Sequence, residues 1–215
     1  TVDHRHTFTD TAPADLAASA GYLGVANTFY NDIGAAIINL NWQQSFNDRK
    51  GGLVVGRFDP NDYQSVHIGS NPWTLFSNIA TAIEPSIALP DSSWGVGAGH
   101  WFNDNLYTLG GINDANGLGS DNLEWFVGGA ELYSWGHVGW SPSRQDRFYK
   151  NIHVSFWHAD ARDARPDDGF SGTDSAKGIN FSANWLLGEL WMPFARYGYS
   201  SGNAPLYNES ATIGL

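Results

Sequence analysis

Regular alternation of apolar and polar residues is the feature that most restricts how this chain can fold. In residues 35–46, Leu40 and Trp42 share one face of an extended chain, while Asn41 and Gln43 occupy the other. The same alternation recurs in three further segments, 129–140, 148–159 and 178–187. A side-chain period of two is typical of β-strands whose two faces meet different surroundings. The sequence therefore predicts an all-β protein.

The pattern predicts about nine strands and a last, incomplete one, with the first of them the weakest. These segments are 22–30, 35–46, 52–58, 93–102, 105–113, 129–140, 148–159, 178–187, 189–199 and 210–215. Short connections at 47–51, 103–104, 141–146 and 188 alternate with long ones at 59–92, 114–128, 160–177 and 200–209. Antiparallel hairpins with every short turn at one end are typical of an outer-membrane barrel. A soluble Greek-key sandwich has no reason to keep this rhythm.

Aromatic residues gather near the expected short turns, as they do where a barrel meets the membrane surface. They are Trp42, Phe46, Trp101, Phe102, Trp140, Phe148, Tyr149, Trp185 and Trp191. Aromatic rings could also fill the core of a soluble sandwich. The opposite strand faces carry uncharged polar residues, however, and such faces suit a wet lumen. We therefore predict an antiparallel transmembrane β-barrel of outer-membrane type.

Composition excludes several classes of protein. Because 22 acidic residues face only 11 basic ones, the net charge of −11 argues against a nucleic-acid partner. The absence of cysteine excludes disulfide scaffolds and thiol nucleophiles. The sequence contains neither a G-x-S-x-G nor an H-E-x-x-H motif, and the acidic loops 114–122 and 160–169 lack the spacing of an EF-hand. We expect no enzyme activity, no metal and no cofactor, since carboxylate pairs such as Glu131 with Glu84 arise easily by chance.

The connection 59–92 is too long for an ordinary loop. An apolar stripe within 72–84 suggests a helical turn that packs against a wall, followed by Pro85 and Pro90. In a barrel such a segment folds inward and narrows or plugs the lumen. In a soluble protein it would be a surface lid.

Several short stretches, spread over residues 22–215 in a fixed order, resemble the carbohydrate-selective porin family (OprB-type) of Gram-negative outer membranes. They are YLGVANTF (22–29), NLNWQQSF (39–46), LVVGRFDP (53–60), FSN with PSIALP (76–90), SWGVGAGHWFNDNLYTLGGINDANG (93–117), VSFWHADA (154–161), FARYGYSSGN (194–203) and SATIGL (210–215). The resemblance implies a monomeric or trimeric barrel of about 16 strands in the outer-membrane lipid, which passes glucose and related sugars. We accordingly expect residues 1–215 to form a single porin domain, as a fragment with nine or ten of those strands.

The lumen-facing residues follow from the alternation, because a charge on the lipid face costs a few kcal/mol at the midplane. We therefore expect Arg57 and Asp59 in the lumen, on the strand face opposite Val54 and Phe58. Glu84, at the end of the inward loop, could form a constriction with Arg57 and Arg196, or these charges could be structural ion pairs. The expected pore-lining residues are Asn39, Asn41, Gln43, Arg57, Asp59, Glu84, Glu131, His153, Asn180, Asn184 and Arg196.

These expectations combine into a passive diffusion channel for small carbohydrates such as glucose. The alternative is a secreted carbohydrate-binding β-sandwich without a channel, which would stay monodisperse without detergent. A third interpretation is a surface barrel that transports nothing because the segment 59–92 plugs it.

Overall fold

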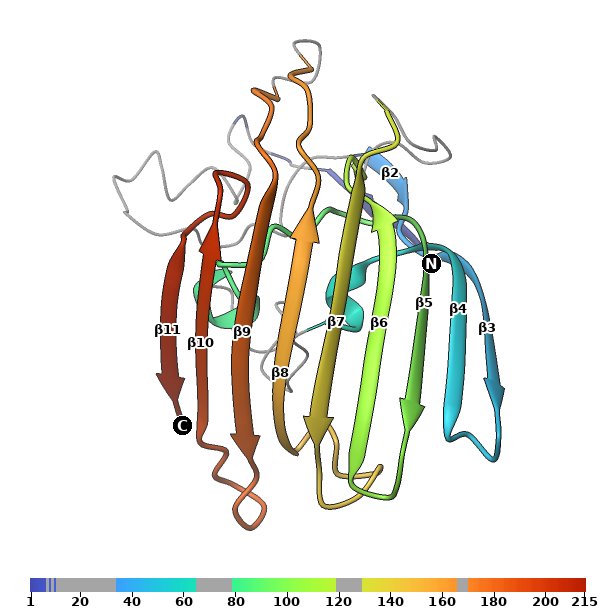
Figure 1. Ribbon diagram of the computed structural model, residues 1–215, viewed down its shortest axis with the longest axis vertical. Helices are drawn as coiled ribbons and strands as arrows, with labels where there is room; N and C mark the ends of the chain where they lie inside the picture. Colours follow the sequence, from blue (N-terminus) through green and yellow to red (C-terminus); the bar gives the residue numbers. More distant parts are fainter. Residues whose placement is uncertain (7, 9, 11–33, 65–78, 119–128, 166–169) are drawn as a thin grey trace.

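One antiparallel sheet dominates the computed structural model, which describes residues 1–6, 8, 10, 34–64, 79–118, 129–165 and 170–215. Its nine strands pair in sequence order, each with the next (Figure 1). They are β3 (Leu40–Phe46), β4 (Gly51–Phe58), β5 (Ser93–Trp101), β6 (Leu106–Asp114), β7 (Leu132–Trp140), β8 (Lys150–Ala159), β9 (Ala176–Trp185), β10 (Phe194–Ser201) and β11 (Glu209–Gly214). The predicted all-β architecture with neighbouring hairpins is confirmed.

All four short connections lie at one end of the sheet, and the long ones begin and end at the other (Figure 1). We call these the turn end and the loop end. The connection between β9 and β10 is longer than expected, because β10 begins at Phe194 and not near 189. Within it, Leu187 and Trp191 form an isolated antiparallel bridge around Gly188, so 186–193 is a small hairpin of its own.

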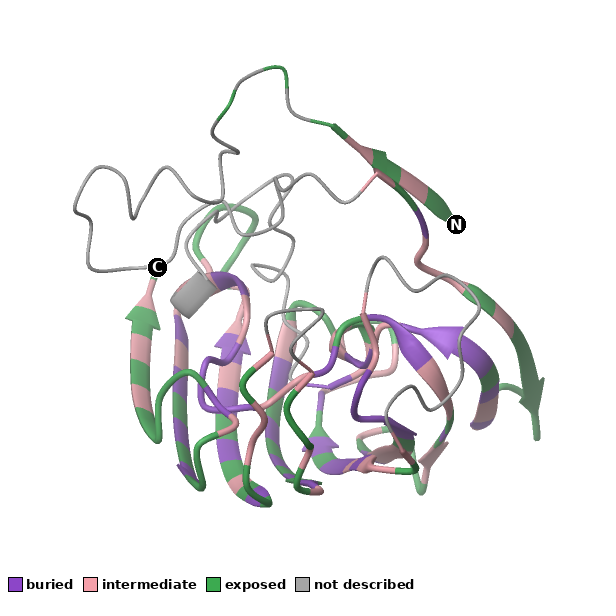
Figure 2. Ribbon diagram, turned by 90° about the horizontal axis from the view of Figure 1, so that it is seen from above, coloured by how far each residue is buried: buried purple, intermediate pink, exposed green. Residues whose placement is uncertain are grey.

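The sheet is curved, as the view from above shows (Figure 2). Strand β8 illustrates its two faces: Asn151, His153 and Ser155 are buried on the concave side, whereas Val154 and Phe156 are exposed on the outer side. Cross-strand partners share a face, so this alternation extends across the sheet. Strands β3 to β11 form one continuous curved sheet and are not divided into two sheets packed face to face, which contradicts the alternative of a β-sandwich.

The outer face carries a broad apolar surface. Its exposed residues include Leu40, Trp42, Val55, Val96, Ile112, Val138, Trp140, Ile152, Val154, Phe156, Ile179, Phe181, Tyr197, Tyr199 and Ile213. Near the turn end, Trp140 and Trp185 stack with ring centroids 6.0 Å apart. Contiguous exposed apolar surface of this extent is unusual for a water-soluble monomer, and it matches the lipid-facing band of a barrel.

A two-stranded sheet at the loop end was not predicted. It pairs β1 (Val2–Arg5) with β2 (Gly34–Ile37). The expected single strand 35–46 is interrupted between β2 and β3, because the backbone N–H groups of Ile38 and Asn39 donate to the carbonyl of Thr1. The expected strand 22–30 lies outside the described residues.

Among the described residues between β4 and β5 there are two short helical turns. They are η1 (Pro60–Asp62) and α2 (Ile79–Ala82). Of the expected helix 72–84, residues 72–78 lie outside the described residues and residues 83–84 are not helical. Asp59 caps η1, since its carboxylate accepts a hydrogen bond of 2.8 Å from the backbone N–H of Asn61. No helix in the described ranges is long and apolar enough to cross a membrane.

An apolar cluster fills the concave side toward the loop end. It consists of Val54, Phe58, Ile87, Ala115, Tyr133, Trp135, Trp157, Ala159 and Ala176. Val54 and Phe58 were expected on the lipid side of β4, and this expectation is wrong. Their register with Gly97 and Ser93 of β5 places them on the concave face, where burial against the aromatic rings keeps them from water.

Candidate functional site on the concave face

Uncharged polar side chains dominate the concave face over β8 and β9. Neighbouring strands contribute Asn151 beside Asn184 and Ser155 beside Asn180, and all of these residues are buried. Such groups must find hydrogen-bond partners inside the molecule or in ordered water. Their placement follows from the period of two, because the same strands turn valine, isoleucine and phenylalanine to the outer face.

The segment that follows α2 covers part of this polar wall. Arg196 on β10 donates to the carbonyl of Thr81 at 3.1 Å, and its Nε lies 3.7 Å from Oε2 of Glu84. Ser86 donates to Glu84 at 2.9 Å and accepts from the side-chain amide of Asn180 at 2.7 Å. Ser210 on β11 also donates to Glu84. These bonds fix residues 81–86 against β9, β10 and β11.

A pair of histidines lies on the adjacent strands β7 and β8. The rings of His137 and His153 are 5.1 Å apart between centroids and inclined by 32°. Both are buried. The side-chain amide of Asn151 lies 3.3 Å from Nδ1 of His153, and Asn151 accepts a hydrogen bond of 2.9 Å from the hydroxyl of Tyr107.

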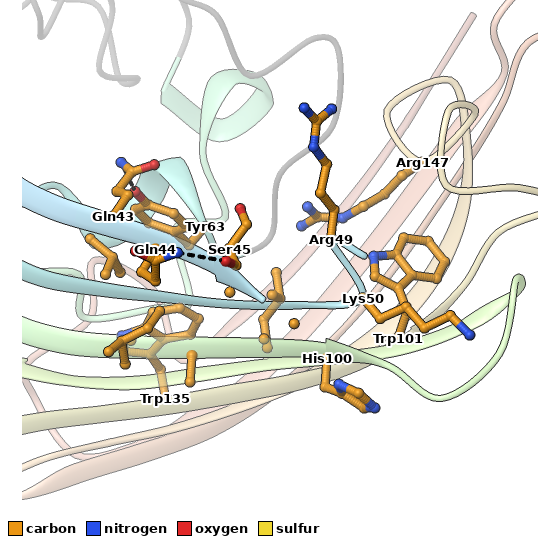
Figure 3. A pocket seen from close by; sticks show the side chains of 18 residues that line it. Gln43, Gln44, Ser45, Arg49, Lys50, Tyr63, His100, Trp101, Trp135 and Arg147 are labelled. Carbon is orange, nitrogen blue, oxygen red and sulfur yellow. Dashed lines mark hydrogen bonds between the residues drawn. The ribbon is translucent and has the colours of Figure 1, made fainter. Parts of the chain in front are cut away.

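The wall changes over β4 to β6, where glycines take the place of many of the polar side chains. Gly52, Gly97 and Gly99 lie on the concave face and leave room for a cavity of about 250 Å³ (Figure 3). Aromatic rings of Tyr63 and Trp135 stand at the end of this cavity nearer the loop end, with ring centroids 6.4 Å apart.

Amide and ring groups around the cavity are held in place by hydrogen bonds. Gln43 donates to the hydroxyl of Tyr63 and to Oδ1 of Asn41, at 3.1 Å in each case. The indole N–H of Trp135 donates to Asn113 at 3.0 Å. Aromatic faces flanked by fixed amides can stack on an apolar sugar face and bind its hydroxyl groups.

Basic side chains lie at the opposite end of the cavity, toward the turn end. Arg49, Lys50 and Arg147 line it together with Trp101 (Figure 3). Trp101 was expected in the outer aromatic girdle, and this expectation is wrong. Its ring lies 4.7 Å from that of Tyr107, its cross-strand partner on β6, and Tyr107 is buried on the concave side.

The predicted residues on β3, β9 and β10 lie on the concave face. Asn41 and Gln43 face the cavity side of β3, and Asn39 immediately precedes this strand. Asn180, Asn184 and Arg196 are buried in the polar wall, as is His153 on β8. Whether any of these side chains lines an open pore stays a prediction.

Two other predicted residues lie at the loop end. Arg57 donates to the carbonyl groups of Ile37 and Leu118, at 2.7 and 2.6 Å, and so joins two loop-end segments. Its cross-strand partners are Leu40 and Trp94. Arg57 therefore lies on the strand face opposite Val54 and Phe58, and the expectation that it faces the lumen is wrong. Glu131 precedes β7 and accepts a hydrogen bond of 2.8 Å from Asn116. The structure brings Glu84 together with Arg196 and places Arg57 elsewhere.

Asp59 is also at the loop end, where its charge is disfavoured. Burial raises the pKa of its carboxyl group to about 7, and the nearby charges of Asp62 and Asp91 act in the same direction. The hydrogen bond from the backbone of Asn61 and the charge of Arg5 oppose this rise in pKa. Near neutral pH Asp59 therefore exists in both protonation states.

The cavity and the cations that line it were not predicted from the sequence. Arg49 and Lys50 lie in the short β3–β4 turn, and Arg147 lies in the β7–β8 connection. The basic residues in both turns were a signal, but only the register of β3 to β6 shows that the two turns adjoin one cavity. No group of three or more histidine or acidic side chains that could hold a metal occurs in the described part of the chain.

Comparison with solved structures finds a match to the high-pH structure of OprB from Pseudomonas putida. The TM-score is 0.62 and the sequence identity is 11%, and the match covers 84% of this chain and 49% of that chain. The chain thus spans about half the length of that protein. At this identity the likeness shows the fold, which is that of an outer-membrane-type barrel with its sheet open between β3 and β11.

No protein-family model matches the chain. No curated protein matches it either.

Proposed function

We propose that this chain forms part of an outer-membrane channel through which small carbohydrates diffuse passively. The observation that carries the proposal is the opposed chemistry of the two sheet faces. On β8, Val154 and Phe156 are exposed on the outer face, whereas Asn151, His153 and Ser155 lie on the concave one. An apolar exterior with a polar interior is the arrangement that a water-filled barrel requires.

The concave face also has the chemistry that suits an uncharged, hydroxyl-rich solute. Amide and hydroxyl groups dominate it over β8 and β9, and aromatic rings flank the cavity over β3 to β6. A volume of about 250 Å³ lies below the roughly 300–1,000 Å³ of pockets for drug-sized ligands. It therefore suits one small ring better than an oligosaccharide. Weak contacts of this kind let a solute leave as readily as it enters.

The name of the similar structure and the family resemblance of the sequence support the same proposal, with small sugars as solutes and the Gram-negative outer membrane as the location. Passive diffusion requires neither a cofactor nor covalent chemistry. A monomer and a homo-oligomer would both be compatible with this function.

Liposome swelling with the full-length gene product tests the proposal. We expect glucose to enter faster than a disaccharide, and much faster than into empty liposomes. Gly52→Trp should slow glucose entry severalfold, because a Cβ atom at Gly52 meets nothing closer than the carbonyl oxygen of Gln44 at 3.9 Å and the indole would occupy the cavity.

Val55→Trp is the matched control, since Val55 lies on the outer face of the same strand and is exposed. It should leave glucose entry unchanged. Absence of swelling with correctly folded protein would contradict the transport proposal and favour a surface barrel plugged by the segment 59–92.

A further inference from the structure

The three cations of the cavity contrast with the charge of the whole chain. The sequence has a net charge of −11, yet Arg49, Lys50 and Arg147 all line one cavity of about 250 Å³. Among the described residues, no carboxylate lies within ion-pair distance of any of the three side chains. Three neighbouring positive charges without a negative partner attract an anion.

Arg144 shows how a structural arginine behaves in the same region. It lies three residues before Arg147 in the same connection, and its guanidinium is 3.4 Å from the carboxylate of Asp104. It also donates to the carbonyl of Asp48 at 3.5 Å. Arg144 thus joins three turns to one another, and it does not line the cavity.

Aromatic rings hold Arg147 in position. Its guanidinium carbon lies 4.9 Å from the ring centroid of Tyr107 and 5.3 Å from that of Phe148. Tyr107 is itself fixed by its hydrogen bond to Asn151 and by its contact with Trp101. A guanidinium held over aromatic rings in this way keeps N–H groups with which it can bind a carboxylate through two hydrogen bonds.

We infer that this cavity binds small sugars that carry a carboxylate, with the anionic group at Arg147, Arg49 and Lys50. The sugar ring would extend toward the other end of the cavity, where Tyr63, which is backed by the buried Trp135, offers an aromatic ring and Gln43 an amide. The inference rests on the proposed function in one respect: it names the solute class for which the channel wall has a binding site. The binding itself does not depend on transport.

Equilibrium binding to the detergent-solubilised full-length protein tests the inference separately from transport. Isothermal titration would compare glucuronate, glucose and inorganic phosphate. We expect glucuronate to bind at least about tenfold more tightly than glucose, because charge-assisted hydrogen bonds are stronger than neutral ones. Arg147→Gln should remove most of this difference, and Gly52→Trp should weaken the binding of glucuronate by filling the cavity.

Arg144→Gln is the matched control, since it removes the same charge from the same connection without changing the cavity wall. It should retain the preference for glucuronate. Equal affinities for glucuronate and glucose would overturn the inference. An equal loss of glucuronate affinity in Arg147→Gln and Arg144→Gln would also overturn it, because it would show that the overall positive charge of the region attracts the anion and that the cavity does not bind it specifically. Phosphate binding as tight as glucuronate binding, and insensitive to Gly52→Trp, would also overturn it by showing a simple anion site. If the sugars bind as expected but liposomes do not swell, only the transport proposal fails.

Discussion

Arg196 and Glu84 face each other across 3.7 Å, and their side chains are 1% and 2% exposed. Arg196 belongs to β10, whereas Glu84 follows α2 in the long connection between β4 and β5. A buried ion pair of this kind is costly to desolvate, and it stabilises a structure only while both partners are present. The pair is therefore one of the main contacts that hold residues 81–86 on the sheet, beside the hydrogen bonds of Ser86 and Ser210.

Glu84→Gln should detach the segment around α2 from the sheet. Removal of one partner of a buried pair costs about 3–5 kcal/mol, because Arg196 keeps its charge without the carboxylate. We expect faster hydrogen exchange in residues 82–87 and a larger single-channel conductance. Glu189→Gln, at an exposed position in the turn-end hairpin 186–193, should change neither quantity. Unchanged exchange in Glu84→Gln would show that the segment is held by other contacts.

Gly198→Ala should displace residues 84–86 from the sheet by adding a methyl group to the surface of β10 against which they pack. A Cβ atom at this position on β10 would overlap Oγ of Ser86 and the side-chain amide of Asn180. We expect a lower midpoint of thermal unfolding and proteolytic cleavage near residues 84–86. Gly52→Ala provides the comparison, since its Cβ atom meets only the carbonyl oxygen of Gln44 at 3.9 Å. Similar unfolding midpoints for the two alanine variants would contradict the close packing at Gly198.

The stability of the loop-end turn at η1 should fall as the pH rises. The pKa of Asp59 is raised from 3.8 to about 7, so the folded state binds a proton that the unfolded state releases near pH 4. The penalty for ionising Asp59 is absent below pH 4, grows between pH 4 and 7, and is complete above that range.

Hydrogen exchange of the amides in 60–64, corrected for intrinsic rates, measures this pH dependence. Asp59→Asn should abolish it, because asparagine can still accept the hydrogen bond from Asn61 and carries no charge. If the protection of these amides fell equally with pH in the wild-type protein and in Asp59→Asn, a group other than Asp59 would be responsible for the pH dependence.

Val154→Arg should test the lipid-facing assignment of the outer face. Val154 lies in the middle of β8 and is 39% exposed. An arginine at the bilayer midplane costs about 2–4 kcal/mol of folding free energy in a barrel. His158→Arg, at the loop end of the same face, should cost about 0–1 kcal/mol because it lies near the interface. Equilibrium unfolding in lipid vesicles measures both values, and equal costs would exclude a membrane around this face.

The sequence by itself determined the strands and most of their faces. The alternation of Asn180, Ser182 and Asn184 with Ile179 and Phe181 specifies one polar and one apolar side of β9, whatever the strand pairs with. This works because a period of two is a local property of extended backbone. The short turns carried equally local signals, so their common end of the sheet was predicted correctly.

Only the tertiary structure decided the face of Arg57 and the partners of the charged residues. The apolar residues Val54 and Phe58 fitted a lipid-facing side by composition, but the aromatic rings of Tyr133, Trp135 and Trp157 give them an apolar place inside. Because the interior of this sheet has an apolar part as well as a polar part, an apolar side chain does not by itself indicate the lipid-facing side of a strand.

The cavity could not be predicted for a similar reason. It joins Arg49 and Lys50 to Arg147, which is almost 100 residues away in the sequence. Their proximity depends on the register of β3 to β7 and on glycines that leave space. Register and empty space are properties of paired strands, and a local pattern of residues does not contain them.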